Sequence, residues 1–255
     1  MISIDKLAYT SDLRKTNPME KFIFSIITMI LCIALNKIVI SVIIFTTMTF
    51  FIVVKGKIPL NIYFKLILLP VSFLIMGILT IAINVLNNNN AVILSFIVLG
   101  FKLGVTEKSL ITAGNIFFKA LASVSCLYFL TLTTPLFEIL IVLRRCKIPK
   151  LFVELMGLMY RFIFILMDRA NMIFISQNCR LGYSNIKIGY KSIGTLITSL
   201  FVSSYKRSQD MYTSMEARCY DGEINLIEYD YKISHKNIVL IVILELILIV
   251  VGVIL

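Results

Sequence analysis

Two arginines, Arg180 and Arg218, have the chemistry and the setting of residues that bind an acidic partner. They occur in two similar polar stretches, ISQNCRLGYS and SQDMYTSMEARCYDGE. Small or apolar residues flank both: Cys179 and Leu181 beside the first, Ala217 and Cys219 beside the second. A guanidinium is always charged, its planar donors match a carboxylate, and small neighbours let a partner approach closely. The alternative is that each is an ordinary cation at a helix C-terminus, where the helix dipole favours it.

The thiols and the imidazole of this chain are not arranged as a metal or redox site. The single histidine, His235, lies in a polar segment without a histidine partner. The five cysteines are far apart and form no C-x-x-C pair, so we expect reduced, mostly buried thiols; they are Cys32, Cys126, Cys146, Cys179 and Cys219. The sequence therefore predicts no metal ligands, no cofactor and no catalytic residues.

Enzymatic chemistry would have to depend on three carboxylates, Glu154, Asp168 and Glu245. None has a partner at catalytic spacing, and the sequence contains neither a Walker A motif nor HExxH. Glu245 lies inside an apolar run, where a carboxylate is a proton site, a cation site or a protonated group facing other helices. Lys119, also inside an apolar run, is expected to face protein or to snorkel. We therefore expect a non-catalytic protein.

The composition indicates an integral membrane protein. Of 255 residues 59% are hydrophobic, and the mean hydropathy is +0.94, well above the range of soluble chains. The net charge of +11 is explained by basic loops on the cytoplasmic side of the bilayer, where anionic lipid favours them. The lipid bilayer is thus the expected partner of this charge, and no motif points to nucleic acid.

The apolar runs predict about five membrane-spanning helices. Residues 22–54 are too long for one span, so the chain should fold back at Asn36 and Lys37. Residues 66–86 and 109–134 form two more spans, and 238–255 the last. The asparagine run 87–90 should lie outside, and the β-branched stretch after it is either a span or an external extended segment; we favour the extended segment.

These spans imply an all-α integral membrane protein in three parts. Residues 1–134 form a membrane domain of about four spans with a cytoplasmic N-terminus. Residues 135–237 form a cytoplasmic segment of long amphipathic helices, one starting after Pro149 and one with an apolar stripe of period 3.6. The stripe comprises Ile193, Leu196, Ile197, Leu200, Phe201, Met211, Tyr212 and Met215. Residues 238–255 form the C-terminal transmembrane helix, and the helix around Arg161 is a doubtful sixth span.

Four stretches of the chain carry a family resemblance by their order and spacing. They are IDKLAYTSDLRKTNPMEK, LTTPLFEILIVLRRCKIPKLFVELMGLMYRFIFIL, CRLGY and YKRSQDMYTSMEARCYDG. Together they resemble the transmembrane T component of energy-coupling-factor (ECF) transporters, in its cobalt-type, CbiQ-like branch. The resemblance implies a scaffold in the bacterial or archaeal cell membrane. Such a scaffold joins a substrate-binding membrane subunit, the S component, to two ABC ATPase subunits through cytoplasmic coupling helices.

The resemblance also implies two coupling motifs, each an arginine between small residues. They correspond here to Cys179-Arg180-Leu181 and Ala217-Arg218-Cys219. Cys179 stands where alanine is usual and Cys219 where glycine is usual. Asn17 replaces a histidine that often precedes the proline of the N-terminal segment, and we interpret that position as structural.

Several functions remain open on the sequence. The first is an energy-coupling scaffold for cobalt uptake; nickel or a vitamin is the alternative substrate within the same class. An intramembrane enzyme would need convergent acids, which the sequence does not place together. A self-contained carrier would predict an internal repeat, and none is evident.

Overall fold

The apolar runs of the sequence form helices, as predicted, in a computed structural model that describes residues 3–85, 92–98, 101–221, 231 and 235–254. The chain divides into two units. One comprises Ile2–Ile139 with Asp230–Leu255 and is called the membrane unit below; the other is Leu140–Tyr229. The asparagine run 87–90 lies outside the described residues.

The membrane unit contains the apolar helices. They are α1 (Ser3–Thr10), the 3-10 helix η1 (Asp12–Lys15), α2 (Pro18–Leu35), α3 (Ile38–Phe50) with its π-helical extension η2 (Phe51–Lys55), α4 (Leu60–Ala82), α5 (Glu107–Thr133) and α9 (His235–Ile254). Four stretches among the described residues are long and apolar enough to cross a membrane: Pro18–Leu35, Ile38–Lys55, Leu60–Ile81 and Ser109–Thr133. The prediction of a multi-pass helical membrane protein is confirmed. The 20-residue α9 remains the predicted fifth span.

The first two spans are joined by a sharp turn at the predicted place. Asn36 ends α2 in the left-handed region at φ 47°, a conformation that asparagine tolerates better than most residues. At the other end of α2, the buried Asn17 side chain accepts a hydrogen bond from the Met19 amide at 3.0 Å. Asn17 is therefore the N-cap of the first span and Pro18 its first residue, so the structural interpretation of Asn17 is confirmed.

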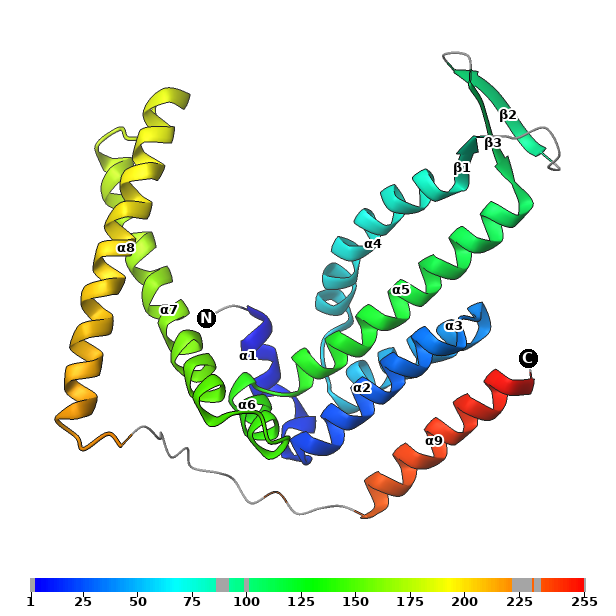
Figure 1. Ribbon diagram of the computed structural model, residues 1–255, viewed down its shortest axis with the longest axis horizontal. Helices are drawn as coiled ribbons and strands as arrows, with labels where there is room; N and C mark the ends of the chain where they lie inside the picture. Colours follow the sequence, from blue (N-terminus) through cyan, green and yellow to red (C-terminus); the bar gives the residue numbers. More distant parts are fainter. Residues whose placement is uncertain (1–2, 86–91, 99–100, 222–230, 232–234, 255) are drawn as a thin grey trace. The chain divides into compact units, whose positions relative to one another are not determined.

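A small sheet is an addition to the all-α prediction. Strands β1 (Ile83–Val85), β2 (Val92–Val98) and β3 (Phe101–Thr106) form an antiparallel sheet in the order β1-β3-β2. It connects the end of α4 to the start of α5 (Figure 1). The β-branched stretch is thus extended and does not form a span, because its residues pair with β3 instead of forming helical hydrogen bonds.

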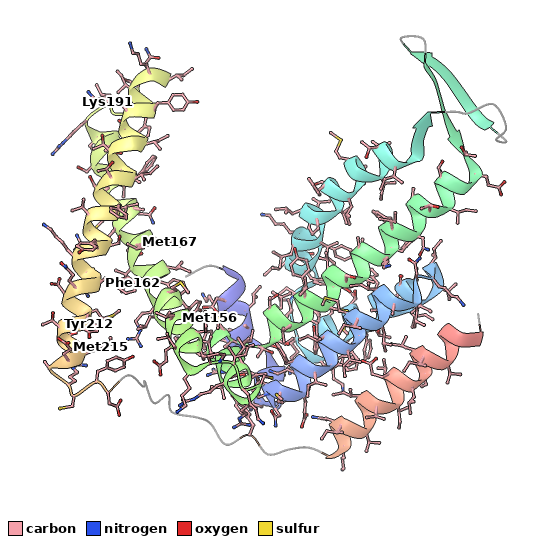
Figure 2. The ribbon with its side chains drawn as sticks, viewed as in Figure 1. Met156, Phe162, Met167, Lys191, Tyr212 and Met215 are labelled. Carbon is pink, nitrogen blue, oxygen red and sulfur yellow. The ribbon has the colours of Figure 1, made fainter. Side chains whose placement is uncertain are left out.

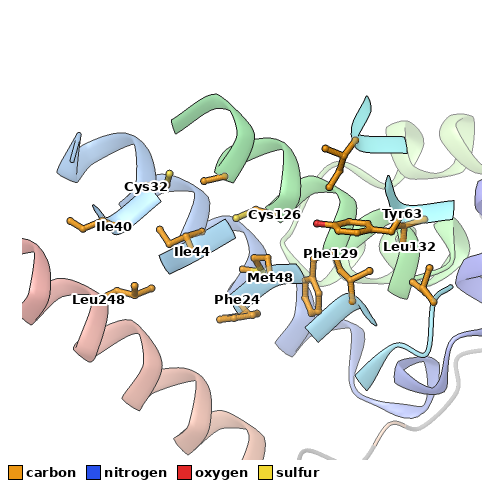
Figure 3. Close-up of a cluster of buried hydrophobic side chains, with 14 residues drawn as sticks. Phe24, Cys32, Ile40, Ile44, Met48, Tyr63, Cys126, Phe129, Leu132 and Leu248 are labelled. Atoms are coloured by element: carbon orange, nitrogen blue, oxygen red, sulfur yellow. The ribbon is translucent and has the colours of Figure 1, made fainter. Parts of the chain in front are cut away.

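The core of the membrane unit is built around α5, which packs against α2, α3 and α4. Figure 3 shows side chains from these helices and from α9 meeting in one cluster; the buried members include Phe24, Ile44, Met48, Tyr63, Cys126, Phe129 and Leu248. The rings of Phe24 and Phe129 meet edge to face with centroids 5.6 Å apart, a favourable aromatic geometry. Helix α4, by contrast, leaves Leu69 and Phe73 more than 75% exposed, as expected of a face toward lipid or another membrane subunit.

Lys119 of α5 and Glu245 of α9, charged residues within apolar helices, both face protein. The Lys119 ammonium donates to the Asn36 Oδ1 atom at 3.1 Å, at the turn between α2 and α3. The buried Glu245 side chain of α9 accepts a hydrogen bond from the Thr28 hydroxyl of α2 at 3.0 Å. Both groups therefore fix helix positions within the unit, which fits the rule that charges in spans point toward protein.

The second unit contains the predicted long amphipathic helices. Helix α6 (Leu136–Arg145) leads into it, α7 spans Lys150–Cys179 and α8 spans Ile186–Glu216. Pro149 directly precedes α7, as predicted. Helices α7 and α8 run antiparallel beside each other as a hairpin (Figure 1).

Candidate functional site

Arg180 lies at the C-terminal end of α7, in a turn closed by two backbone hydrogen bonds. It is the C-cap residue. The Leu181 amide donates to the Asn178 carbonyl at 3.0 Å and the Gly182 amide to the Gln177 carbonyl at 2.9 Å. This is the bonding pattern of a Schellman motif, in which the residue after the cap is left-handed. That residue is Leu181, with φ 57°.

Arg218 lies in an equivalent turn at the end of α8. The Cys219 amide donates to the Glu216 carbonyl at 3.0 Å and the Tyr220 amide to the Met215 carbonyl at 3.1 Å. Cys219 is left-handed at φ 59°. Each arginine thus immediately precedes the left-handed residue of the same type of turn. The sequence similarity between the two stretches therefore extends to their backbone geometry.

The turn alone is an ordinary helix end, because α6 ends in the same way. There Lys147 is the left-handed residue at φ 61°, and Cys146 occupies the place that an arginine takes in the other two turns. What distinguishes the ends of α7 and α8 is the arginine itself. Both arginines are exposed, and neither guanidinium makes a hydrogen bond or ion pair with the described residues, so their donors are available to another protein.

The two arginines occupy opposite ends of the hairpin. Arg180 follows α7, close to where α8 begins, and Arg218 follows α8. Helix α8 has 31 residues, which at about 1.5 Å per residue gives a length of about 46 Å. Figure 2 shows the same antiparallel order: Tyr212 and Met215 of α8 lie near the level of Met156 of α7, and Lys191 lies toward the other end. The two sites are too far apart to form one binding site.

A side-chain network holds the end that carries Arg180. The Gln177 amide group donates to the Ser192 carbonyl at 3.0 Å and its oxygen accepts from the Tyr183 hydroxyl at 2.8 Å. The Ser192 hydroxyl donates to the Gly182 carbonyl at 2.7 Å. A Cβ atom on Gly182 would lie 2.8 Å from the Gln177 carbonyl oxygen, so only glycine fits there. The network joins α7, the turn and α8, and thereby fixes the backbone around Arg180.

A long-range hydrogen bond links α8 to α7 at the end that carries Arg218. The Tyr220 hydroxyl donates to the Glu154 Oε2 atom of α7 at 3.2 Å. Desolvation raises the pKa of Tyr220, and the Glu154 carboxylate raises it further by accepting the hydrogen bond and by its charge. The phenol therefore remains a protonated donor near neutral pH. Tyr220 ties the end of α8 to the first turns of α7.

Packing between α7 and α8 covers only part of the apolar face of the hairpin. On α8, Leu196, Leu200, Met211 and Met215 of the predicted stripe are half-buried. The other members, Ile193, Ile197, Phe201 and Tyr212, are between 47% and 71% exposed. Large apolar side chains of α7 such as Met159 and Met172 are also more than half exposed. An exposed apolar surface of this extent is typical of a binding face.

The carboxylates of α7 and the five cysteines are the other side chains with possible chemistry. Glu154 and Asp168 lie fourteen residues apart on α7, about 21 Å along the helix, so they do not form a pair of acids. The expectation of mostly buried thiols is wrong: Cys32 and Cys126 are buried, but Cys146, Cys179 and Cys219 are exposed. The exposed thiols all lie at helix ends, where the short turns leave their side chains uncovered.

The sequence did not point to the residues that shape the two sites. Gln177, Tyr183 and Ser192 are ordinary polar residues in the sequence, and Glu154 stands out there only as a candidate acid. The one available signal was the glycine at position 182, which follows Arg180 by two residues. Pairing Gln177 with Ser192 requires the hairpin geometry, which the sequence pattern does not specify.

Comparisons with known proteins agree on one family. Residues 10–229 match the family model of the cobalt transport protein CbiQ. The chain is 31% identical over 249 residues to an uncharacterised protein of Methanocaldococcus jannaschii, covering 98% of this chain and 92% of that protein. It is 28% identical to the cobalt transport protein CbiQ of Salmonella typhimurium, over 89% of this chain and all of that protein. It is also 30% identical to the ECF transporter transmembrane protein EcfT of Ruminiclostridium cellulolyticum, over 82% and 80% of the two chains. This multi-pass membrane protein belongs to the CbiQ family of cobalt transport proteins.

Proposed function

We propose that this protein is the transmembrane coupling subunit of an ECF-type importer, transmitting movement of two ATPase subunits to a substrate-binding membrane subunit. It carries out no chemistry of its own in this function. The ATPases hydrolyse ATP, and the S component binds the substrate. Arg180 and Arg218 bind one ATPase subunit each.

The observation that carries the proposal is the equivalence of the two arginine turns. Two homologous or identical ATPase subunits offer two equivalent acidic grooves, and a scaffold that engages both needs two equivalent contacts far apart. The hairpin supplies them: the same turn, the same exposed arginine, and about 46 Å of helix between them. Cys179 and Leu181 flank one arginine and Ala217 and Cys219 the other. Cys179, Ala217 and Cys219 are small, and Leu181, 73% exposed, adds an apolar contact beside Arg180.

The exposed apolar face of the hairpin supports a further contact, with the S component. Phe201 and Tyr190 of α8 are 71% and 75% exposed, a poor arrangement in water for a helix without a partner. A membrane subunit whose cytoplasmic surface is apolar would cover them. The exposed face of α4 offers a second apolar surface within the bilayer.

Cobalt is the proposed substrate of the complex, because the matching family and the Salmonella relative are both described as cobalt transport proteins. The EcfT relatives make nickel or a vitamin the alternative, since a scaffold does not itself select the substrate. An enzyme would need acids that the sequence places together, and a self-contained carrier would need an internal repeat. The sequence shows neither feature, so these functions are not proposed.

The test is copurification of the ATPases with arginine variants of the full complex. Arg180→Ala and Arg218→Ala should each weaken ATPase recovery and Co²⁺ uptake, and the double variant should abolish both. Removing one member of a buried charge pair costs about 2–5 kcal/mol, whereas losing a helix-dipole contact costs about 0.3–1 kcal/mol. Arg218→Glu should be worse than Arg218→Ala, because it places like charges together.

Matched controls are Arg169→Ala on α7 and Arg207→Ala on α8, which remove exposed arginines from the middle of a helix and near its end. Both controls should retain ATPase recovery and uptake. Normal recovery and uptake in the double variant Arg180→Ala/Arg218→Ala would reduce the two turns to ordinary helix ends and remove the main support for the proposal.

A further inference from the structure

The chain leaves the membrane unit after Ile139 and returns to it at Asp230, and a carboxylate beside the first crossing contacts a residue beside the second. Glu138, in the first turn of α6, directly precedes Ile139, the last residue before the exit. Its Oε1 atom accepts a hydrogen bond from the hydroxyl of Tyr231, one residue after the return, at 2.7 Å. The two chain segments that connect the units are therefore linked to each other by the hydrogen bond between Tyr231 and Glu138.

The same carboxylate is also held by the N-terminal part of the membrane unit. The Arg14 Nε atom of η1 lies 3.8 Å from Glu138 Oε1, and the Lys21 ammonium of α2 lies 4.0 Å from Glu138 Oε2. The Lys21 and Glu138 side chains are only 5% and 8% exposed. Removing one partner of a buried ion pair strongly destabilises a protein, because the other charge stays buried without its counterion.

Lys21 connects the carboxylate to two further segments. Its ammonium donates to the Leu13 carbonyl of η1 at 3.1 Å and to the Thr133 carbonyl, the last residue of α5, at 3.0 Å. Carbonyls at a helix C-terminus carry the negative end of the helix dipole, so a cation is well placed there. Beside this cluster, the Asn237 amide group of α9 donates to the Glu20 Oε2 atom of α2 at 3.3 Å.

The Lys21 ammonium and the Glu138 carboxylate are close enough to attract each other electrostatically, but they are too far apart to form a hydrogen bond. At 4.0 Å they form an ion pair, and Glu138 Oε2 has no hydrogen-bond partner among the described residues. The firm bonds are those of Lys21 to the membrane unit and of Tyr231 to Glu138. The contact between Lys21 and α6 is thus the one that can lengthen or shorten with little loss of hydrogen bonding.

We propose that Arg14, Lys21, Glu138 and Tyr231 form a joint that sets how the helix hairpin is held on the membrane unit and passes its movement to α2, α5 and α9. Glu138 is the positioning residue of this joint. The inference rests on the proposed coupling function, and it adds the place where force enters the membrane unit. Arg180 and Arg218 are where force enters the hairpin.

The test uses the full complex with its ATPases and S component, and compares Glu138→Gln, Lys21→Met and the double variant Lys21→Met/Glu138→Gln. Glu138→Gln leaves the buried Lys21 ammonium without its carboxylate, Lys21→Met leaves Glu138 with Arg14 as its remaining cation, and the double variant removes both buried charges. The exposed ion pair between Asp12 and Lys57 provides the control variant, Asp12→Asn. The measurements are membrane abundance, ATPase copurification, ATP hydrolysis and Co²⁺ uptake.

The double variant separates a joint from a merely stabilising ion pair. We expect it to restore abundance and ATPase copurification while Co²⁺ uptake per ATP hydrolysed stays about tenfold lower than in the wild type, within the range of mutations that act on coupling. Asp12→Asn should match the wild type in all four measurements. Uptake per ATP restored to the wild-type value in the double variant would overturn the proposal.

A second measurement does not depend on the ATPases. Spin labels at Thr80→Cys on α4 and Lys206→Cys on α8 report the distance between the units, in a background with the three exposed cysteines changed to serine. A distance distribution that broadens in Glu138→Gln and in the double variant, and not in Asp12→Asn, is the expected result. An unchanged distribution would overturn the joint whatever the ATPase experiments show. Failed ATPase copurification in the wild type would instead count against the coupling function alone.

Discussion

The left-handed residues after the two arginines carry a conformational cost that glycine would avoid. Leu181 and Cys219 have φ angles of 57° and 59°, where a side chain with a Cβ atom costs about 1 kcal/mol or more. Leu181 is 73% exposed, so packing does not offset this cost. Leu181 and Cys219, of which Cys219 departs from the usual glycine, therefore weaken the turns slightly without displacing the arginines.

Replacing either residue by glycine should strengthen its turn. We expect Leu181→Gly and Cys219→Gly to raise local stability by about 0.5–1 kcal/mol, because glycine adopts positive φ without strain. Hydrogen exchange of the Gly182 and Tyr220 amides measures this directly, since both amides close the turns. Thr198→Gly, at an exposed helical position of α8, should lower protection nearby. Faster exchange at Gly182 in Leu181→Gly would show that the strain is absent.

The ion pair between Asp12 and Lys57 should give a pH-dependent contribution to stability. The Lys57 ammonium lies 2.6 Å from Asp12 Oδ2; its hydrogen bond and its charge lower the pKa of Asp12, and the same contacts raise the pKa of Lys57. The contribution is present above the unfolded pKa of Asp, about 4, and below that of Lys, about 10.4. It is lost as the pH falls through the lowered pKa or rises through the raised one.

The Tm of Asp12→Asn measures this contribution against the wild type. The variant should have a lower Tm than the wild type at pH 7, and the difference should shrink as the pH falls below about 4. Because both side chains are more than half exposed, 1 M salt should reduce the difference at pH 7 as well. A difference that stays constant from pH 7 to pH 3 would contradict the assignment.

At the scale of elements, α7 and α8 form a hairpin whose own packing is sparse. Val153 and Gly189 are the buried residues of the two helices among the described part of the chain. Hydrogen bonds at the two ends, Gln177 with Ser192 and Tyr220 with Glu154, add specific links between the helices. A hairpin of this kind depends on partners to cover its apolar face and on its ends to keep the register.

Gln177→Ala should loosen the end of the hairpin that carries Arg180. It removes the donor to the Ser192 carbonyl and the acceptor of the Tyr183 hydroxyl, each worth about 1 kcal/mol. We expect faster hydrogen exchange over residues 180–192 and weaker ATPase recovery than in the control Gln209→Ala, an exposed position of α8. Slower or equal exchange in Gln177→Ala would show that these hydrogen bonds do not stabilise the end of the hairpin that carries Arg180.

At the scale of the whole molecule, the basic loops predict one orientation in the membrane. Lys55 ends the second span, Lys57 lies between the second and third spans, and Arg144 and Arg145 at the end of α6 follow the fourth. The positive-inside rule assigns these segments to the cytoplasm. The asparagine run between α4 and β2 then lies outside, and the hairpin of α7 and α8 lies inside.

Single-cysteine labelling in intact cells tests this orientation. In a background without native cysteines, Asn88→Cys should react with a membrane-impermeant reagent, whereas Arg145→Cys and Lys206→Cys should react only after the cells are opened. The result follows from the distribution of Lys and Arg among short loops. Labelling of Lys206→Cys in intact cells would reverse or break the proposed topology.

The sequence by itself determined which parts of the chain are helices and roughly where they end. Apolar runs, the turn at Asn36 and the proline before α7 are local signals, and the structure places α2, α3 and α7 accordingly. The arginines at the ends of α7 and α8 were also visible, because their position depends only on where periodicity stops. Local backbone preferences and hydrophobic patterning carry this information along the chain.

Only the tertiary structure decided which residues meet. It assigns the same turn to Leu181 and Cys219, although neither residue type indicates positive φ. It also brings Glu138 to Lys21 and Tyr231, which are 117 and 93 positions away in the sequence. Such contacts depend on how helices pack, and many packings are compatible with one pattern of apolar residues. The joint and the two arginine turns therefore become apparent only when side chains distant in sequence are seen together.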